Sequence, residues 1–427
     1  MNSIRATHQQ IAFSAGKRET AFNTEQTLDT LMSFEMGNIA NLQARREDDS
    51  GETIGQEEAS RLYDDGATVA FPVAAAKAQA QHFGMMLAYA LGQIATAAQG
   101  DGFMHTITPI DDDLDGNRSN PSFTAAMRYG KTIAKRRFAG CVVDSFTAKF
   151  ARGSWITLDA QIMGSGKYTG DTTMETLEAA GNAESLTLAA NGVAGSTAAE
   201  RLNNVQAIMV ELASGIWTPV AFSAVSAATP AIITITSPGG SADPVDYQIL
   251  YRPVEAAWGT FPARLVEDPL RISELTLNVG GTWTGSAFSG GRTLTAELLS
   301  MEWQFNNNGE MMFVPGAGGA YAGRYARDNR TQKIALSREF RDMRMQHHIT
   351  DNTTFGIYLK AEGALYDETY RRAVELVWPK CAVLAAPIGT EGNRISEAVD
   401  IQVLQDATYA SVIAKVANLA ETYASAT

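Results

Sequence analysis

The chain has 427 residues, 45% of them apolar and 19% charged, which is the balance of a globular protein of two or three domains and excludes wholesale disorder. Its 47 acidic and 34 basic side chains give a net charge of −13, which excludes coating of nucleic acid through bulk attraction. The only two cysteines, Cys141 and Cys381, cannot build a disulfide framework, so we expect buried thiols, with one bridge as the alternative.

The beginning of the chain gives no sign of a secretory signal. The sequence MNSIRATHQQIAF has no apolar stretch of the required kind, and no run of roughly 18 or more apolar residues predicts a membrane span. We therefore expect a soluble protein with no membrane partner. Further along, Asp48 to Gly66 is acidic and contains glycine, which predicts a long exposed loop.

The stretch 73–99 is the clearest predicted helix. It follows Pro72, a residue tolerated at a helix start, and it is rich in alanine, the best helix former. Apolar side chains recur at three- and four-residue spacing and form one face: Phe83, Met86, Leu87, Ala90, Leu91 and Ile94. Gly100 to Gly102 ends the pattern.

The segment from Arg137 to Lys167 predicts a β-hairpin. Two runs in which successive residues alternate in character, 142–150 and 156–162, indicate strands whose two faces meet different environments. Ala151 to Ser154 forms the turn, where Gly153 provides backbone freedom.

The rest of the chain is predicted to be mainly β and to divide into three parts. Residues 1–165 and 266–427 form two β-rich halves, while 166–265 holds a Gly- and Ala-rich connector, 164–201, and a small inserted β domain. Alternation continues through 333–348 in the last part. Because Val142 to Ile162 and Leu298 to Arg341 are each typical of a strand, a turn and an alternating strand, we also expect a duplication.

Motifs that carry chemistry are incomplete in this sequence. Asp111, Asp113 and Asp115 begin like a calcium loop, but the twelfth position is Ser122 instead of the bidentate Glu. The adjacent His347 and His348 would point to opposite faces of a strand and so would not bind a metal together. Nucleophile, redox and dinucleotide signatures are missing as well. We therefore expect no enzyme and no cofactor, with those three aspartates as a candidate Ca²⁺ site.

Charged clusters suggest contacts between copies of the chain. The basic residues are Lys135, Arg136, Arg137, Arg324 and Arg327, and the acidic ones are Glu57, Glu58, Asp64 and Asp65. In a repeating assembly one chain supplies both partners of such contacts. The alternative is that each cluster is a solvated strand end.

Several segments, taken in order, resemble a known family. They are LAYALG (87–92), GFMHTITP (102–109), NPSFTAAMRYG (120–130), GCVVDSFTAKF with GSWITLDAQIMGSG (140–166), LLSMEWQFNNNGE (298–310), YRRAVELVWPKCAVL (370–384) and VIAKVANLAETY (412–423). The order resembles the tail tube proteins of long-tailed bacteriophages over most of 60–165 and 270–425. The resemblance implies a β-sandwich or split barrel with a flanking helix, in rings that stack into a hollow tube.

The resemblance also implies partners and a place of action. The chain would assemble with itself, as a trimer with pseudo-six-fold symmetry or as a hexamer, and would meet other tail proteins at the tube ends. DNA would pass through the lumen without specific binding, past a lining of carboxylates, and the loop 48–66 would contact the next ring. The inserted domain would lie on the outer wall, in the tail of a virion made in bacterial cytoplasm. The alternatives are another virion shell component, a capsid or decoration protein, and a secreted β-rich binding module.

Overall fold

The computed structural model describes residues 6–37, 40–52, 55, 57–110, 120–129, 134–254, 261–315 and 320–426. The chain is mainly β, as predicted, with three short α-helices among the described residues. It forms two compact units: a larger one of Met1–Met127, Arg137–Tyr168 and Phe261–Thr427, and a smaller one of Arg128–Arg136 and Thr169–Thr260. Within the described ranges, no helix combines the length and the apolar character needed to span a membrane.

The smaller unit contains two antiparallel sheets that share one core. One sheet has the order β11 (Thr173–Ala180), β17 (Pro244–Tyr251), β13 (Val205–Ala213) and β14 (Ile216–Pro219), and the other has β12 (Ser185–Thr187), β16 (Ile232–Ile235) and β15 (Phe222–Val225). Buried side chains from both sheets, including Ile233 and Tyr247, pack into the same cluster. A short helix, α2 (Ala198–Asn203), begins with a capping box between Thr197 and Glu200.

The connector predicted for 164–201 is wrong, because β10 (Tyr168–Gly170), β11 and β12 lie within it and α2 begins there. In β11 the exposed and half-buried residues alternate without one fully buried position. The sequence of β11 therefore does not predict a strand clearly, because it has few apolar side chains. Its strand conformation is set by antiparallel pairing with β17.

A long antiparallel sheet dominates the larger unit. Its strands are hydrogen-bonded in the order β3 (Asn41–Asp48), β4 (Leu62–Ala75), β9 (Thr157–Gly164), β8 (Ala134–Ala151), β20 (Leu298–Asn306), β23 (Thr331–Glu339), β27 (Arg394–Val403) and β26 (Ile388–Glu391). One face carries the buried side chains of the core, such as Phe71, Trp303 and Ile401. We call these eight strands the long sheet.

A second run of strands packs behind the long sheet. Its order is β5 (Gly92–Gln99), β6 (Gly102–Pro109), β28 (Ile413–Asn418), β25 (Arg371–Ala385), β24 (Phe355–Leu365), β18 (Leu275–Trp283) and β19 (Phe288–Thr293). The end of β25 also pairs with β27, so the two runs are connected. Smaller elements complete the unit: β1 (Gln10–Phe13), β2 (Thr30–Met32), β7 (Phe123–Tyr129), β10 (Tyr168–Gly170), β21 (Glu310–Met312), β22 (Arg324–Ala326), α3 (Arg344–Thr350) and two 3-10 turns, Ala6–His8 and Ile272–Glu274.

Helix α1 covers only Ala80–Leu91, not the predicted 73–99. Every residue of the helix is buried, and it packs against β5, β6, β28 and β9. It ends at Gly92, whose φ of 92° suits glycine alone at little cost. The alanines that follow, which favour a helix by propensity, lie in β5 because pairing with β6 satisfies their backbone.

The predicted hairpin between Arg137 and Lys167 is confirmed. Strands β8 and β9 pair in antiparallel register, and Gly153 has a φ of 76° in the turn. Phe146, Ala148 and Phe150 are buried, whereas Lys149 between them is exposed. Two other predictions are wrong. His347 and His348 lie in α3 rather than in a strand. The predicted loop 48–66 is too long at both ends, because residues 49–61 connect β3 to β4 while Asp48 and 62–66 belong to the strands.

The long sheet contains an internal repeat. Leu42 pairs with Val69 between β3 and β4, and Phe305 pairs with Gln332 between β20 and β23, with the same number of residues inside each pair. Cys141 lies opposite Gly164, and Cys381 lies opposite Val403, with spacings that differ by one residue.

The repeat therefore matches β3 to β20, β4 to β23 and β9 to β27. Strand β8 is matched to the end of β25 together with β26. Segments 142–162 and 298–341, expected to be copies of one another, are instead neighbours through the β8–β20 pairing.

Candidate assembly surfaces

One face of the long sheet is polar and uncovered across β9, β8, β20, β23 and β27. We call it the polar face. It is built from rungs of facing side chains, such as Asp159, Thr147, Gln304, Lys333 and Gln402, each opposite the next on the neighbouring strand. Its other members are Thr157, Gln161, Ser145, Lys149, Ser300, Glu302, Asn306, Ala335, Ser337, Ala398 and Asp400.

The polar face carries both signs of charge among short uncharged side chains. Lys149 and Glu302 form an ion pair at 3.5 Å across β8 and β20, with 48% and 31% of their side chains exposed. Such an exposed pair adds little stability, so it mainly cancels charge locally. The result is a surface of hydroxyl, amide and methyl groups that offers nucleic acid no concentrated cationic patch.

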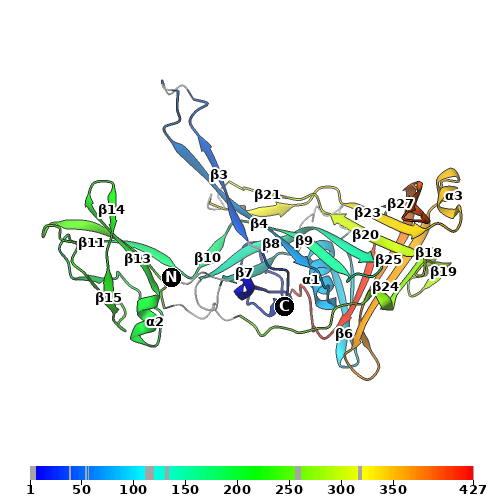
Figure 1. Cartoon of the computed structure of the whole chain (residues 1–427), viewed down its shortest axis with the longest axis horizontal. Coiled ribbons are helices and arrows are strands. Elements are labelled where there is room, and N and C mark those ends of the chain that lie inside the picture. Colours follow the sequence, from blue (N-terminus) through cyan, green and yellow to red (C-terminus); the bar gives the residue numbers. More distant parts are fainter. Residues whose placement is uncertain are drawn as a thin grey trace. The chain divides into compact units, whose positions relative to one another are not determined.

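The strands β3 and β4 extend away from the body of the larger unit as a two-stranded hairpin (Figure 1). Seven of the eight residues of β3 and the first four residues of β4 are exposed, so this outer part of the hairpin buries little apolar surface. Cross-strand ion pairs support it instead: Arg45 with Asp65 at 3.0 Å, and Arg46 with Asp64 at 3.8 Å. We call β3, the outer half of β4 (62–68) and the loop between them the projecting hairpin.

The loop of the projecting hairpin closes on Asp49. Its carboxylate accepts hydrogen bonds from the Ser60 hydroxyl at 2.7 Å and from the backbone N–H groups of Ser60 and Arg61 at 2.8 and 3.1 Å. The bond from the Ser60 hydroxyl is the main reason that the pKa of the Asp49 carboxyl lies below its ordinary value. These three hydrogen bonds close the base of the loop.

The acidic residues predicted as contacts all lie on the projecting hairpin. Glu57 and Glu58 are exposed in its loop, while Asp64 and Asp65 of β4 pair with arginines of β3. Sequence reasoning missed Arg45 and Arg46. The available signal was the pair of basic residues, Arg45 and Arg46, before a turn-rich segment and the pair of acidic residues, Asp64 and Asp65, after it.

The basic residues predicted as contacts are scattered. Arg137 forms an ion pair with Glu25, and buried Arg327 donates to the carbonyl of Ile110 at 3.3 Å, so both side chains serve the chain's own packing. Arg136 and Arg324 are exposed, at the beginning of β8 and in β22, and Lys135 is half-buried. The five basic side chains therefore lie on different elements, and two of them contribute to the packing of the chain itself.

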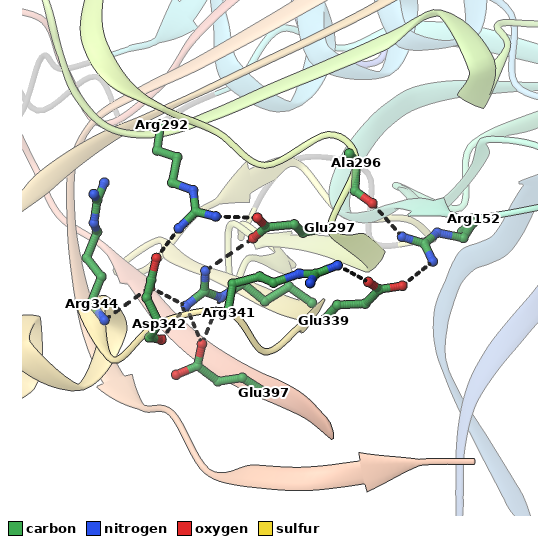
Figure 2. Close-up of polar contacts among 10 residues, drawn as sticks. Arg152, Arg292, Ala296, Glu297, Glu339, Arg341, Asp342, Arg344 and Glu397 are labelled. Atoms are coloured by element: carbon green, nitrogen blue, oxygen red, sulfur yellow. Dashed lines mark hydrogen bonds and ion pairs between the residues drawn. The ribbon is translucent and has the colours of Figure 1, made fainter. Parts of the chain in front are cut away.

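A charged network fastens the two repeats to one another (Figure 2). Arg338 of β23 and Glu397 of β27 are 1% and 0% exposed, and the Arg338 Nε donates to the Glu397 carboxylate at 2.7 Å. Arg338 also reaches Asp342 at 3.1 Å. Beside it, Glu339 accepts from Arg152 of the β8–β9 turn at 2.8 Å and from Arg394 of β27 at 2.7 Å.

The carboxyl groups of this network have shifted pKa values of both signs. Burial raises the pKa of Glu397, against the opposing effect of Arg338. Hydrogen bonding from Arg152 is the largest cause of the lowered pKa of Glu339. Ionised Glu339 therefore stabilises the fold at neutral pH, and that contribution is lost as the pH falls through its lowered pKa. Glu397 acts in the opposite sense, because ionising it against burial costs free energy.

The remaining candidates are a metal site at three aspartates and a disulfide between the two cysteines. Asp111, Asp113 and Asp115 lie outside the described residues. Within the described ranges, no three His, Cys, Asp or Glu side chains gather in a way that would hold a metal ion. Cys141 and Cys381 are free and buried, which confirms the expected thiols, and burial raises the pKa of both.

Comparison with known proteins gives no family for this chain. No protein-family model matches it, and no curated protein matches it either. Function therefore has to be inferred from the surfaces themselves: the polar face, the projecting hairpin and the edges of the long sheet.

Proposed function

We propose that this protein is a structural subunit of a bacteriophage tail tube. Copies of the chain would close into rings, and the rings would stack into a hollow tube through which DNA leaves the virion. The subunit would act in the virion tail after synthesis in the host bacterial cytoplasm, with other tail proteins at the tube ends and no catalytic role. The resemblance of the sequence segments to tail tube proteins supports the same proposal.

The observation that carries the proposal is the long sheet. One face is apolar and buried, the other is polar and uncovered, and the ladder of hydrogen bonds continues over eight strands. Closing such a sheet with identical neighbours removes its exposed edges and leaves a polar wall around an axis. We propose that the polar face lines that lumen.

The chemistry of the polar face suits passage of DNA. DNA carries one negative charge per roughly 1.7 Å of its axis, so clustered lysines would hold it and a strongly acidic wall would repel it. Asp159, Glu302 and Asp400 are interspersed with Lys149 and Lys333 on this face. The proposed lumen is thus a mixed polar wall, rather than the carboxylate lining expected from the net charge.

The copy number follows from the repeat. Each chain contributes two matched sets of strands, so three chains would supply six sets around the axis, as a trimer with pseudo-six-fold symmetry. A hexamer of chains would supply twelve. We propose the trimer, and the projecting hairpin as the contact between stacked rings.

Negative-stain electron microscopy of the purified protein tests this function. We expect rings or stacked tubes with a central channel, and analytical ultracentrifugation of single rings should give the mass of three chains. Closed shells would favour a capsid or decoration protein. A protein that stays monomeric at high concentration, with no channel in any oligomer, would overturn the proposal and favour a β-rich binding module.

A further inference from the structure

The long sheet ends at two strands that lack an outer neighbour among the described residues. Strand β3 pairs with β4 only, and β26 pairs with β27 only. All four residues of β26 are exposed, and Ile388, at 42% exposure, lies there close to Leu384, at 58%. Open edges with exposed apolar side chains are sites where another strand adds.

The internal repeat shows which strand would add to β26. In the first repeat, Leu158 of β9 lies between Ala75 of β4 and Ala148 of β8. In the second, Glu397 of β27 lies between Arg338 of β23 and Ile388 of β26. Strand β26 therefore takes the place of β8, and β20 takes the place of β3.

The first repeat already makes the missing contact inside one chain. The outer edge of β8 pairs in antiparallel register with β20, and Asn306 lies opposite Ser145. The corresponding strand for the outer edge of β26 is β3, which in the same chain lies at the far end of the sheet. A β3 from another copy is the strand that fits.

We propose that β26 of one copy, with the end of β25 before it, pairs antiparallel with β3 of the next copy, in the manner of β8 with β20. This inference rests on the proposed ring assembly and names the strands that join its subunits. Each joint uses two different edges, so it is a head-to-tail contact, the kind that generates closed rings. Carrying over the β8–β20 register places Gln43 opposite Ala385.

The backbone of β26 is oriented for this pairing. The Ala398 N–H donates to the Pro387 carbonyl at 3.1 Å, so the main-chain groups of Pro387 turn toward β27. Successive residues of a strand turn their main-chain groups to alternate sides. Those of Ile388 and Thr390 therefore turn to the open edge, and the N–H that proline lacks belongs to the inner side, where it does not weaken the outer pairing.

Disulfide trapping tests the joint. The double variant Gln43→Cys/Ala385→Cys should, on oxidation, give covalent multimers that end at the copy number of the ring. The matched control Ser145→Cys/Asn306→Cys places the equivalent pair within one chain and should remain at monomer mass. Both native cysteines are buried and should not interfere.

The outcomes separate this inference from the proposed function. Rings in the microscope without cross-linking of the Gln43→Cys/Ala385→Cys variant would overturn the β26–β3 joint and leave the ring assembly standing. Cross-linking of Gln43→Cys alone into dimers would also overturn it, because that result means β3 pairs with β3. A wild-type protein that forms no rings would instead contradict the proposed function.

A second variant covers the case in which the double variant does not fold. Thr390→Pro removes an N–H that faces the open edge but keeps the bonds to β27, so the chain should fold, by circular dichroism, and form no rings. Thr390→Val keeps the N–H and should assemble as the wild type does. Folded Thr390→Pro protein that still forms normal rings would refute the joint.

Discussion

At the scale of residues, equivalent positions of the two repeats hold opposite chemistry. In the first repeat, Ala75 and Leu158 face one another. At the equivalent positions of the second repeat, Arg338 and Glu397 form a buried ion pair. A buried pair gains attraction but loses hydration, so it stabilises less than its short distances suggest. Asp342 also contacts Arg338, and this third charged group holds the pair within the network that joins the repeats.

This contrast predicts a difference between single and double substitution. Glu397→Leu leaves the Arg338 charge buried without its nearest partner and should lower the free energy of unfolding by about 3–5 kcal/mol. Arg338→Ala/Glu397→Leu recreates the pair of the first repeat and should lose much less. Chemical denaturation of both variants measures this. A double variant as unstable as the single one would show that packing, and not the lone charge, sets the loss.

At the scale of elements, the projecting hairpin is notable for how little it buries. An isolated two-stranded hairpin is marginally stable in water, and this one is supported by ion pairs, by Asp49 at its loop and by Arg45, whose guanidinium lies 4.2 Å above the Phe313 ring. We propose that the exposed surface of this element meets a partner, the next ring.

Shortening this element should separate ring formation from stacking. Replacing residues 49–61 with Asn-Gly keeps the ladder of β3 and β4 but removes the loop that we propose meets the next ring. We expect single rings of normal size and few or no tubes, counted by electron microscopy. Tubes of normal length from this variant would contradict the role of the loop in stacking.

At the scale of the whole molecule, the smaller unit has a core of its own, to which residues such as Ile208, Ile233 and Tyr247 contribute. Its first and last long strands, β11 and β17, pair so that Thr173 lies opposite Tyr251. The two ends of the segment are therefore close together, which is the arrangement in which domain insertion and removal are tolerated.

Excision of this segment is a direct test. Joining Thr172 to Arg252 through a short Gly-Ser linker, without residues 173–251, should leave the larger unit folded, and rings of the same copy number should form. Circular dichroism, ultracentrifugation and electron microscopy measure these outcomes. Loss of rings from a folded variant would show that the smaller unit takes part in assembly, against its proposed place on the outer wall.

Much of the fold could be predicted from alternation alone. In β8 and β9 one face is buried against the core and the other is solvated, so Phe146 and Lys149 carry the signal in their own chemistry. The middle of α1 could be predicted from its apolar spacing. The end of α1 at Leu91 could not be predicted. The alanines after Gly92 favour a helix by propensity, but their pairing with β6 places them in a strand.

The candidate assembly surfaces were only partly predictable. The acidic residues of the projecting hairpin stood out by charge. The beginning of β4, 62–66, was predicted as part of a loop because the residues that support it, such as Arg45 for Asp65, lie on the other side of the turn. The polar face was not predictable, since Ser145 and Asn306 become neighbours only when β8 meets β20. The alternation of side chains along a strand is a local property, so it can be predicted from the sequence. The order of the strands depends on which strands, distant in the sequence, pack together and bury apolar surface, and only the tertiary structure determines that.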